Sequence, residues 1–223
     1  MNIVTGSSGG LGEKVYKAFE DNELPVLGID IKESSCTDIV SDLSSRESVE
    51  NIIKQFEGQI DSITFSHAIG NSIKEIEEYD ISQFKYINAE SNLDFLTHTN
   101  HLLGKNSSVV FLSSVHAIAT NSSSGTYALS KNYLESIYRY VCLENQKYKF
   151  KKCMLRIGAM DTPMLHRNVQ DIGLLERELP SENIISPIDL AKLVIDIHLN
   201  YKDLLNCSIL QIDGGVLYKL GTD

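Results

Sequence analysis

The sequence predicts an α/β protein built on a doubly wound parallel sheet of about seven strands, flanked by helices on both faces. Short apolar runs alternate with helical patterns along the whole chain, which is typical of successive βα units. Repeats, low-complexity tracts and linker-like segments are absent, so we expect residues 1–223 to form a single domain. A short substrate loop is expected at about residues 159–186.

The predicted strands are short apolar runs that end in polar or turn-forming residues. They cover residues 3–4, 26–29, 60–65, 108–112, 153–157 and 208–212.

The predicted helices follow these strands. Apolar residues at helical spacing begin at Leu11, and Ser44 with Glu47 forms a capping box for a second helix. Longer helices are expected at about 81–103 and 126–144, with an irregular stretch at about 158–185. Ser186 is expected to cap the N-terminus of another helix, with Pro187 at its first helical position. This helix should reach about residue 199.

Composition and charge exclude several classes of protein. The chain has 20 basic and 30 acidic residues, a formal net charge of −10, which disfavours binding to nucleic acid or anionic membranes. Its four cysteines are scattered, with no spacing typical of a zinc site or a disulfide framework, so no metal is expected. Neither a signal peptide nor a membrane span is evident. We expect a cytoplasmic protein whose ligand is a small molecule.

A glycine-rich segment at residues 5–12, Thr-Gly-Ser-Ser-Gly-Gly-Leu-Gly, separates the first strand from the first helix. Glycines in this position allow a tight turn and let the backbone approach a pyrophosphate at the helix N-terminus. Asp30 ends the second strand, where a carboxylate accepts hydrogen bonds from an adenosine ribose and repels a 2′-phosphate. The pattern predicts a Rossmann fold that binds NAD in preference to NADP, although the nearby Lys32 leaves NADP possible.

A second pattern suggests proton transfer. Tyr127 and Lys131 are four residues apart at the start of a predicted helix, so their side chains should share one face. A nearby ammonium group lowers the pKa of a phenol and makes it a better base. Ser114 ends the preceding strand, at the edge where a parallel sheet opens onto its ligand.

Taken together, these motifs resemble those of the short-chain dehydrogenase/reductase family over nearly the whole chain. The matching residues are Thr5, Gly6, Gly10, Gly12, Asp30, Asp42, Leu43, Asn88, Ser114, Tyr127, Lys131, Thr162, Pro163, Met164, Asp213, Gly214 and Gly215.

The resemblance implies a role for each site residue. Tyr127 would be the general acid/base, Lys131 would lower its pKa and bond the nicotinamide ribose, Ser114 would hold the substrate oxygen, and Asn88 would keep a proton-relaying water. The implied cofactor-binding residues are Gly6, Ser8, Gly10, Leu11, Gly12, Asp30, Asp42, Leu43, Ser66, Ala68, Tyr127, Lys131 and Thr162.

The chain also departs from the family pattern. Residues 66–69 read Ser-His-Ala-Ile where the family usually has Asn-Asn-Ala-Gly, and Ile157 replaces the usual proline before Gly158. His67, Glu90 and His116 lie near the motif residues and either line a polar pocket or make structural hydrogen bonds.

The sequence thus predicts an NAD(H)-dependent oxidoreductase that interconverts a secondary alcohol and a ketone on a small polar substrate. The alternative is a non-catalytic NAD(H)-binding regulator on the same fold. A nucleotide-sugar epimerase or dehydratase is disfavoured because the chain has no room for a longer C-terminal substrate domain. The resemblance further implies a homodimer or homotetramer, paired through the helices of Asn88 and Tyr127, with Phe95 and Tyr138 as candidate exposed apolar residues.

Overall fold

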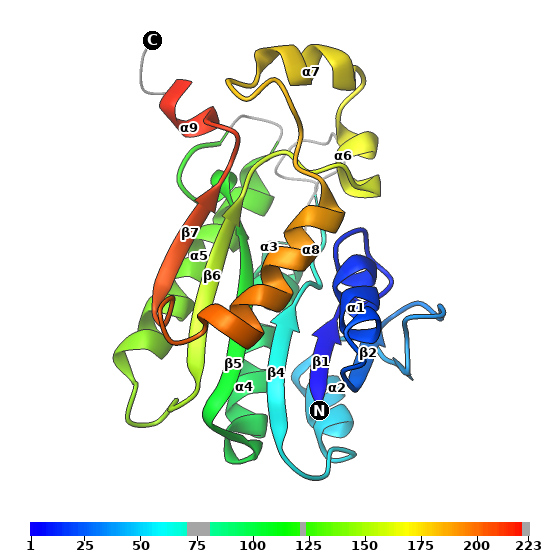
Figure 1. The fold of residues 1–223 in the computed structure, drawn as a ribbon, viewed down its shortest axis with the longest axis vertical. Coiled ribbons are helices and arrows are strands. Elements are labelled where there is room, and N and C mark those ends of the chain that lie inside the picture. The colour runs from blue at the N-terminus through cyan, green and yellow to red at the C-terminus, as the bar shows by residue number, and fades with distance from the viewer. Residues whose placement is uncertain (71–80, 121–123, 220–223) are drawn as a thin grey trace.

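The predicted doubly wound sheet is present. The computed structural model describes residues 1–70, 81–120 and 124–219, and its seven strands are all parallel, in the order β3-β2-β1-β4-β5-β6-β7 (Figure 1). The strands are β1 (Asn2–Thr5), β2 (Val26–Asp30), β3 (Ile39–Val40), β4 (Ile60–Phe65), β5 (Leu103–Ser114), β6 (Lys151–Ile157) and β7 (Ser208–Ile212). The order reverses direction between β1 and β4, where ligands bind in folds of this type.

The six strands predicted by range are confirmed, and two features of the sheet were missed. The seventh strand, β3, is a two-residue edge strand, too short to show any periodicity. Strand β5 starts five residues earlier than expected, because its first half is polar and its register against β4 shifts between the pairs of Ile60 and Ser62.

Helices cover both faces of the sheet. They are α1 (Gly12–Asp21), α2 (Arg46–Ile53), α3 (Ile81–Lys85), α4 (Ser91–Thr99), α5 (Gly125–Leu143), α6 (Pro163–Asn168), α7 (Ile172–Glu178), α8 (Pro187–Asp196) and α9 (Val216–Lys219). Shorter turns include the π-helical η2 (Tyr86–Glu90) and η6 (Ile197–Tyr201) and the 3₁₀ turns η3 (Asn100–Leu102) and η4 (Val115–Ala117). Among the described helices, none is long and apolar enough to cross a membrane.

Three helix predictions need correction. The helix expected at 81–103 is interrupted by η2 and ends in η3, because the chain widens into a π turn between α3 and α4. The α2 helix is capped by Ser45, whose side chain accepts from the Ser48 N–H, and not by Ser44. The stretch expected to be irregular contains α6 and α7, whereas the Ser186 cap of α8 is confirmed.

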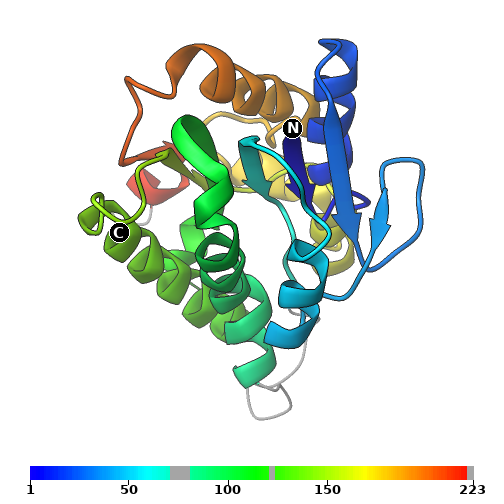
Figure 2. The same cartoon turned by 90° about the horizontal axis from the view of Figure 1, so that it is seen from below.

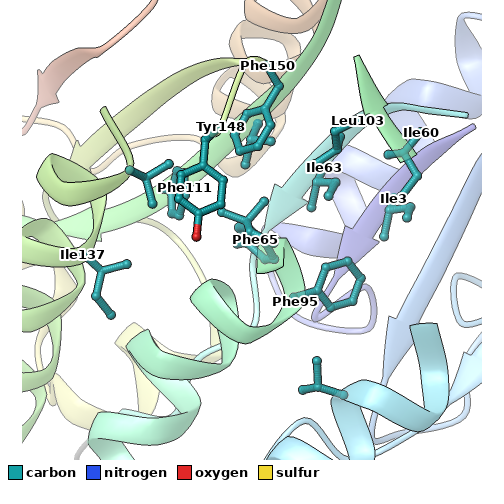
Figure 3. Close-up of a cluster of buried hydrophobic side chains, with 14 of the residues drawn as sticks. Ile3, Ile60, Ile63, Phe65, Phe95, Leu103, Phe111, Ile137, Tyr148 and Phe150 are labelled. Carbon is teal, nitrogen blue, oxygen red and sulfur yellow. The ribbon is translucent and has the colours of Figure 1, made fainter. Parts of the chain in front are cut away.

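Two hydrophobic layers hold the helices on the sheet. On one face α1 and α8 pack together, and on the other lie α2, α4 and α5 (Figure 2). The second layer is rich in aromatic rings, including Phe65, Phe95 and Phe111 (Figure 3). Phe95 and Tyr138 belong to this core, so the expectation that they are exposed for subunit pairing was wrong.

A buried histidine joins η6 to the two central strands. The His198 ring contacts the Thr64 hydroxyl of β4 through Nε2, at 2.9 Å, and the Ser108 hydroxyl of β5 through Nδ1, at 2.6 Å. The ring also lies 5.9 Å from that of Phe19 in α1, measured between centroids. Burial lowers the pKa of His198 to about 3, so the ring is neutral at pH 7.

We predict that His198 makes the fold sensitive to acid. Its pKa is lower in the folded chain than in the unfolded chain, so its contribution to stability is complete above about pH 6.5 and is lost as pH falls towards 3. The unfolding free energy, measured by urea denaturation, should fall between pH 7 and pH 5 in both wild type and His198→Gln. The fall should be about 2 kcal/mol smaller in His198→Gln, because the titrating ring is absent. The matched control, His101→Gln, changes an exposed ring and should leave that fall unchanged. The same acid sensitivity in wild type and His198→Gln would contradict the prediction.

Candidate active site

The glycine segment forms a tight turn at the carboxyl end of β1. Gly6 has a φ of +70°, and a Cβ atom there would lie 2.5 Å from the backbone nitrogen of His67. A Cβ on Gly12 would lie 2.0 Å from the Gly6 carbonyl oxygen, so neither position accepts a side chain. The α1 helix starts here, and its N-cap residue Leu11 makes no side-chain capping bond. The turn therefore presents the positive end of a helix at the edge of the sheet.

Asp30 lies beside this turn in a fixed orientation. One carboxylate oxygen accepts from the Ser8 N–H and the other from the Lys32 N–H, each at 2.9 Å. Both oxygens keep lone pairs for further donors, as a ribose diol would supply. Lys32 contacts the carboxylate through its backbone, and its side chain is exposed.

The other predicted cofactor residues surround the same edge with different accessibility. Thr162 packs over the glycine turn, because a Cβ on Gly10 would lie 2.7 Å from its Cγ2 atom. Asp42 is exposed and accepts from the Ser44 N–H, at 2.9 Å, whereas the side chain of Leu43 is buried in the core. Leu43 can therefore offer a ligand only its main chain.

The segment after β4 borders the glycine turn. The Ser66 N–H donates to the Thr5 carbonyl at 3.0 Å, which continues the pairing of β4 with β1 beyond the end of the strands. Ser66 and Ala68 are both half-buried. Ser66 therefore lies beside the turn, and the role of Ser66 and Ala68 in binding a cofactor stays a prediction.

The structure brings Ser114, Tyr127 and Lys131 together. Ser114 ends β5 and hydrogen-bonds with Tyr127, which lies in the first turn of α5. The Lys131 ammonium lies 5.7 Å from the centre of the Tyr127 ring and donates to the Leu112 carbonyl at 2.8 Å. A hydroxyl pair and a buried cation thus share one end of the sheet.

Burial dominates the protonation of this group. Packing around the phenol raises the pKa of Tyr127 to about 12, and the hydrogen bond with Ser114 only partly opposes this effect. Burial also lowers the pKa of Lys131 to about 8. In the protein alone, burial therefore outweighs the effect of Ser114 and keeps the pKa of Tyr127 above the ordinary value of a phenol.

Asn88 lies in the π turn η2 and is fully buried. Its side-chain oxygen accepts from the Ile69 N–H at 2.8 Å, and its amide nitrogen donates to the Ile69 carbonyl and to the Ser130 hydroxyl, both at 2.9 Å. Ser130 donates in turn to the Tyr127 carbonyl at 2.7 Å. Asn88 thereby connects the segment after β4 to the first turn of α5.

The three residues considered for a polar pocket lie in different places. The His116 ring is edge-on to the Tyr127 ring, with centroids 6.1 Å apart, and burial lowers its pKa. Glu90 instead pairs with Lys85 at 2.9 Å on the surface of the π turn. His67 lies between hydroxyl groups of β1 and α4. His116 is therefore the one of the three that contacts the catalytic candidates.

A buried carboxylate that the sequence analysis missed anchors α5. Glu135 lies one turn beyond Lys131 and is fully buried; it accepts from the Ser113 hydroxyl at 3.0 Å. Arg156 of β6 donates to both of its oxygens, at 2.9 and 2.7 Å. The spacing of four from Lys131 was the one available signal, since it puts both side chains on the face of the helix that meets the sheet.

Comparisons with known proteins agree with this geometry. A family model described as enoyl-(acyl carrier protein) reductase matches residues 10–217. A tropinone reductase homolog of Arabidopsis thaliana is 23% identical over 240 residues, covering 96% of this chain and 91% of that protein.

Solved structures of the same kind share the fold. A short-chain dehydrogenase from Burkholderia cenocepacia in complex with NADP superposes with a TM-score of 0.85 at 19% identity, over 97% of both chains. The 3-ketoacyl-(acyl-carrier-protein) reductase from Brucella melitensis complexed with NADH gives 0.82 at 18% identity, over 96% of both chains. Because the family model covers most of the sequence and the fold agrees throughout, the chain belongs to the short-chain dehydrogenase/reductase family of oxidoreductases.

Proposed function

We propose that the protein is an NAD(H)-dependent oxidoreductase that interconverts a secondary alcohol and a ketone on a small polar substrate. The observation that carries this proposal is the hydrogen-bonded pair of Ser114 and Tyr127 with the Lys131 ammonium beside it. Two neighbouring hydroxyl groups can both form hydrogen bonds with one substrate oxygen. Such a pair can give a proton to a carbonyl oxygen or take one from a carbinol.

The residues around the glycine turn fit a nicotinamide dinucleotide. The turn has no space for side chains at Gly6 and Gly12, and the first turn of α1 favours the negative charge of a pyrophosphate. Asp30 would bind the adenosine ribose, and Thr162 would lie near the nicotinamide end. When bound, this cofactor supplies the hydride that is added to a ketone or accepts the one removed from an alcohol.

The chain's own groups would handle the proton. Tyr127 donates its hydroxyl proton to the substrate oxygen during reduction and takes one up during oxidation, while Ser114 holds that oxygen through a hydrogen bond. Lys131 favours the ionised phenol by its charge. The side chain of Asn88 is engaged with Ile69 and Ser130, so it would contribute by position rather than by touching the reacting atoms.

The proposed preference for NAD over NADP rests on Asp30. A carboxylate with both oxygens fixed by backbone donors cannot turn away from a 2′-phosphate, and like charges at close range repel. The two solved structures above were obtained with NADP and with NADH, so fold alone does not decide between the two cofactors.

We predict that Tyr127→Phe strongly lowers turnover while the protein still binds NADH. Loss of a general acid/base should lower kcat by about 10²- to 10⁴-fold, measured by NADH absorbance on a panel of secondary alcohols and small polar ketones. Tyr133→Phe is the matched control, because it removes a phenol from the exposed side of the same helix and should keep full activity. Wild-type activity in Tyr127→Phe would refute the mechanism. Tight NADH binding by a wild-type protein that turns over no alcohol or ketone would instead favour the regulator.

We predict that Asp30→Asn changes the cofactor preference. Removing the negative charge should strengthen NADPH binding by about 10-fold and weaken NADH binding severalfold, measured by the fluorescence of the reduced cofactors. Lys32→Ala should leave the ratio of the two dissociation constants within about twofold of the wild-type value, because its side chain is exposed. A wild-type preference for NADPH, or a ratio that changes only in Lys32→Ala, would overturn this assignment.

A further inference from the structure

His67 replaces a residue that is usually asparagine in the family, and its ring joins two hydroxyl groups from distant parts of the chain. Nδ1 lies 2.6 Å from the Thr5 hydroxyl of β1, and Nε2 lies 2.9 Å from the Ser91 hydroxyl of α4. Packing around the ring, and the nearby charge of Lys131, lower the pKa of His67 to about 3. The ring is therefore neutral and carries a single N–H.

The hydrogen bonds determine which nitrogen carries that proton. Ser91 donates its hydroxyl proton to the Ile87 carbonyl at 2.8 Å, so it can only accept from the ring. Nε2 is therefore the donor, and Nδ1, which has no proton, accepts from the Thr5 hydroxyl. The hydrogen bonds thus run from the Thr5 hydroxyl through His67 to Ser91 and the Ile87 carbonyl, which the ring also contacts.

One end of this path reaches the dinucleotide turn. Thr5 is the last residue of β1 and directly precedes Gly6, whose missing side chain leaves room for the His67 backbone. His67 thus contacts the start of the turn through both its backbone and its side chain.

The other end reaches the π turn that carries Asn88. Ile87 lies within this turn and Ser91 follows it. Asn88 in turn holds Ser130, which bonds the Tyr127 carbonyl. Two series of hydrogen bonds, joined through the backbone between Ile87 and Asn88, therefore connect the glycine turn to the helix that bears the catalytic candidates.

We propose that His67 is a positioning residue that couples dinucleotide binding to the π turn, and so to the placement of Asn88 and the first turn of α5. The inference rests on the proposed function. An asparagine at this position can reach Thr5 with its amide but is too short to reach Ser91, whereas the imidazole spans both. The coupling is thus a property of the histidine in this chain.

A double-mutant cycle tests this coupling without relying on turnover. The dissociation constant of NADH is measured by its fluorescence in wild type, Ser91→Ala, His67→Asn and the double variant. Ser91 contacts the side of the His67 ring that faces away from the glycine turn. If the ring transmits the coupling, Ser91→Ala should weaken NADH binding about fivefold in the wild-type background. In the His67→Asn background, where the link to Ser91 is already broken, the same change should have an effect of less than about 1.5-fold.

A second cycle with Thr5→Val breaks the path from the other end and should also abolish the effect of Ser91→Ala. It keeps the test valid if His67→Asn fails to fold, which circular dichroism and thermal melting would reveal. A residue that only stabilises the fold would lower the melting temperature but leave the effects on NADH binding additive. Equal effects of Ser91→Ala in both backgrounds, or no effect in wild type, would overturn the coupling. Wild-type protein that binds neither NADH nor NADPH would instead refute the proposed function on which the coupling rests.

Discussion

The buried contact between Glu135 and Arg156 fixes the position of α5 against the ends of β5 and β6. Both oxygens of the carboxylate are engaged by the guanidinium group, and one also accepts from Ser113, the neighbour of Ser114. Removing Glu135 would leave the guanidinium group of Arg156 without its carboxylate, and breaking a buried pair in this way costs about 3–5 kcal/mol. The helix therefore has one register on the sheet, and Tyr127 and Lys131 are positioned by it.

This register has an electrostatic consequence. The negative charge of Glu135 is compensated by Arg156 and Arg139, and Lys131, the cation beside the Tyr127 ring, has no carboxylate partner among the contacts of the described residues. Burial nevertheless keeps the phenol protonated and raises its pKa to about 12. We propose that Tyr127 ionises more readily when a bound ligand adds positive charge near Lys131. The protein alone therefore keeps Tyr127 protonated at neutral pH.

The features that the sequence predicted well are those with local signals. Apolar runs located six strands, and a glycine turn followed by a carboxylate at Asp30 indicated where the strands open onto a ligand. Spacing along one helix brought Tyr127 and Lys131 together on the correct face. Each of these depends on residues close together in sequence or on a strict order of short elements.

The features that the sequence did not predict depend on contacts between distant segments. The π turn at Asn88 interrupts a region whose apolar spacing suits a continuous helix, and the strand β3 is held mainly by its neighbour β2. The two partners of His67 lie 62 and 24 residues away, so no local pattern could assign its role. The raised pKa of Tyr127 likewise results from packing in three dimensions, whereas the sequence showed only the cation four residues away.

The most direct test of this account is the ionisation of Tyr127 with and without NAD⁺. The ultraviolet difference spectrum between wild type and Tyr127→Phe reports this single phenol as pH is raised. Without the cofactor, we expect Tyr127 to stay protonated up to about pH 10.5, because burial holds its pKa near 12. With saturating NAD⁺, half-ionisation should occur at least about two pH units lower than that pKa. A phenol that ionises near neutral pH in the free protein, or one whose pKa NAD⁺ leaves unchanged, would contradict the account.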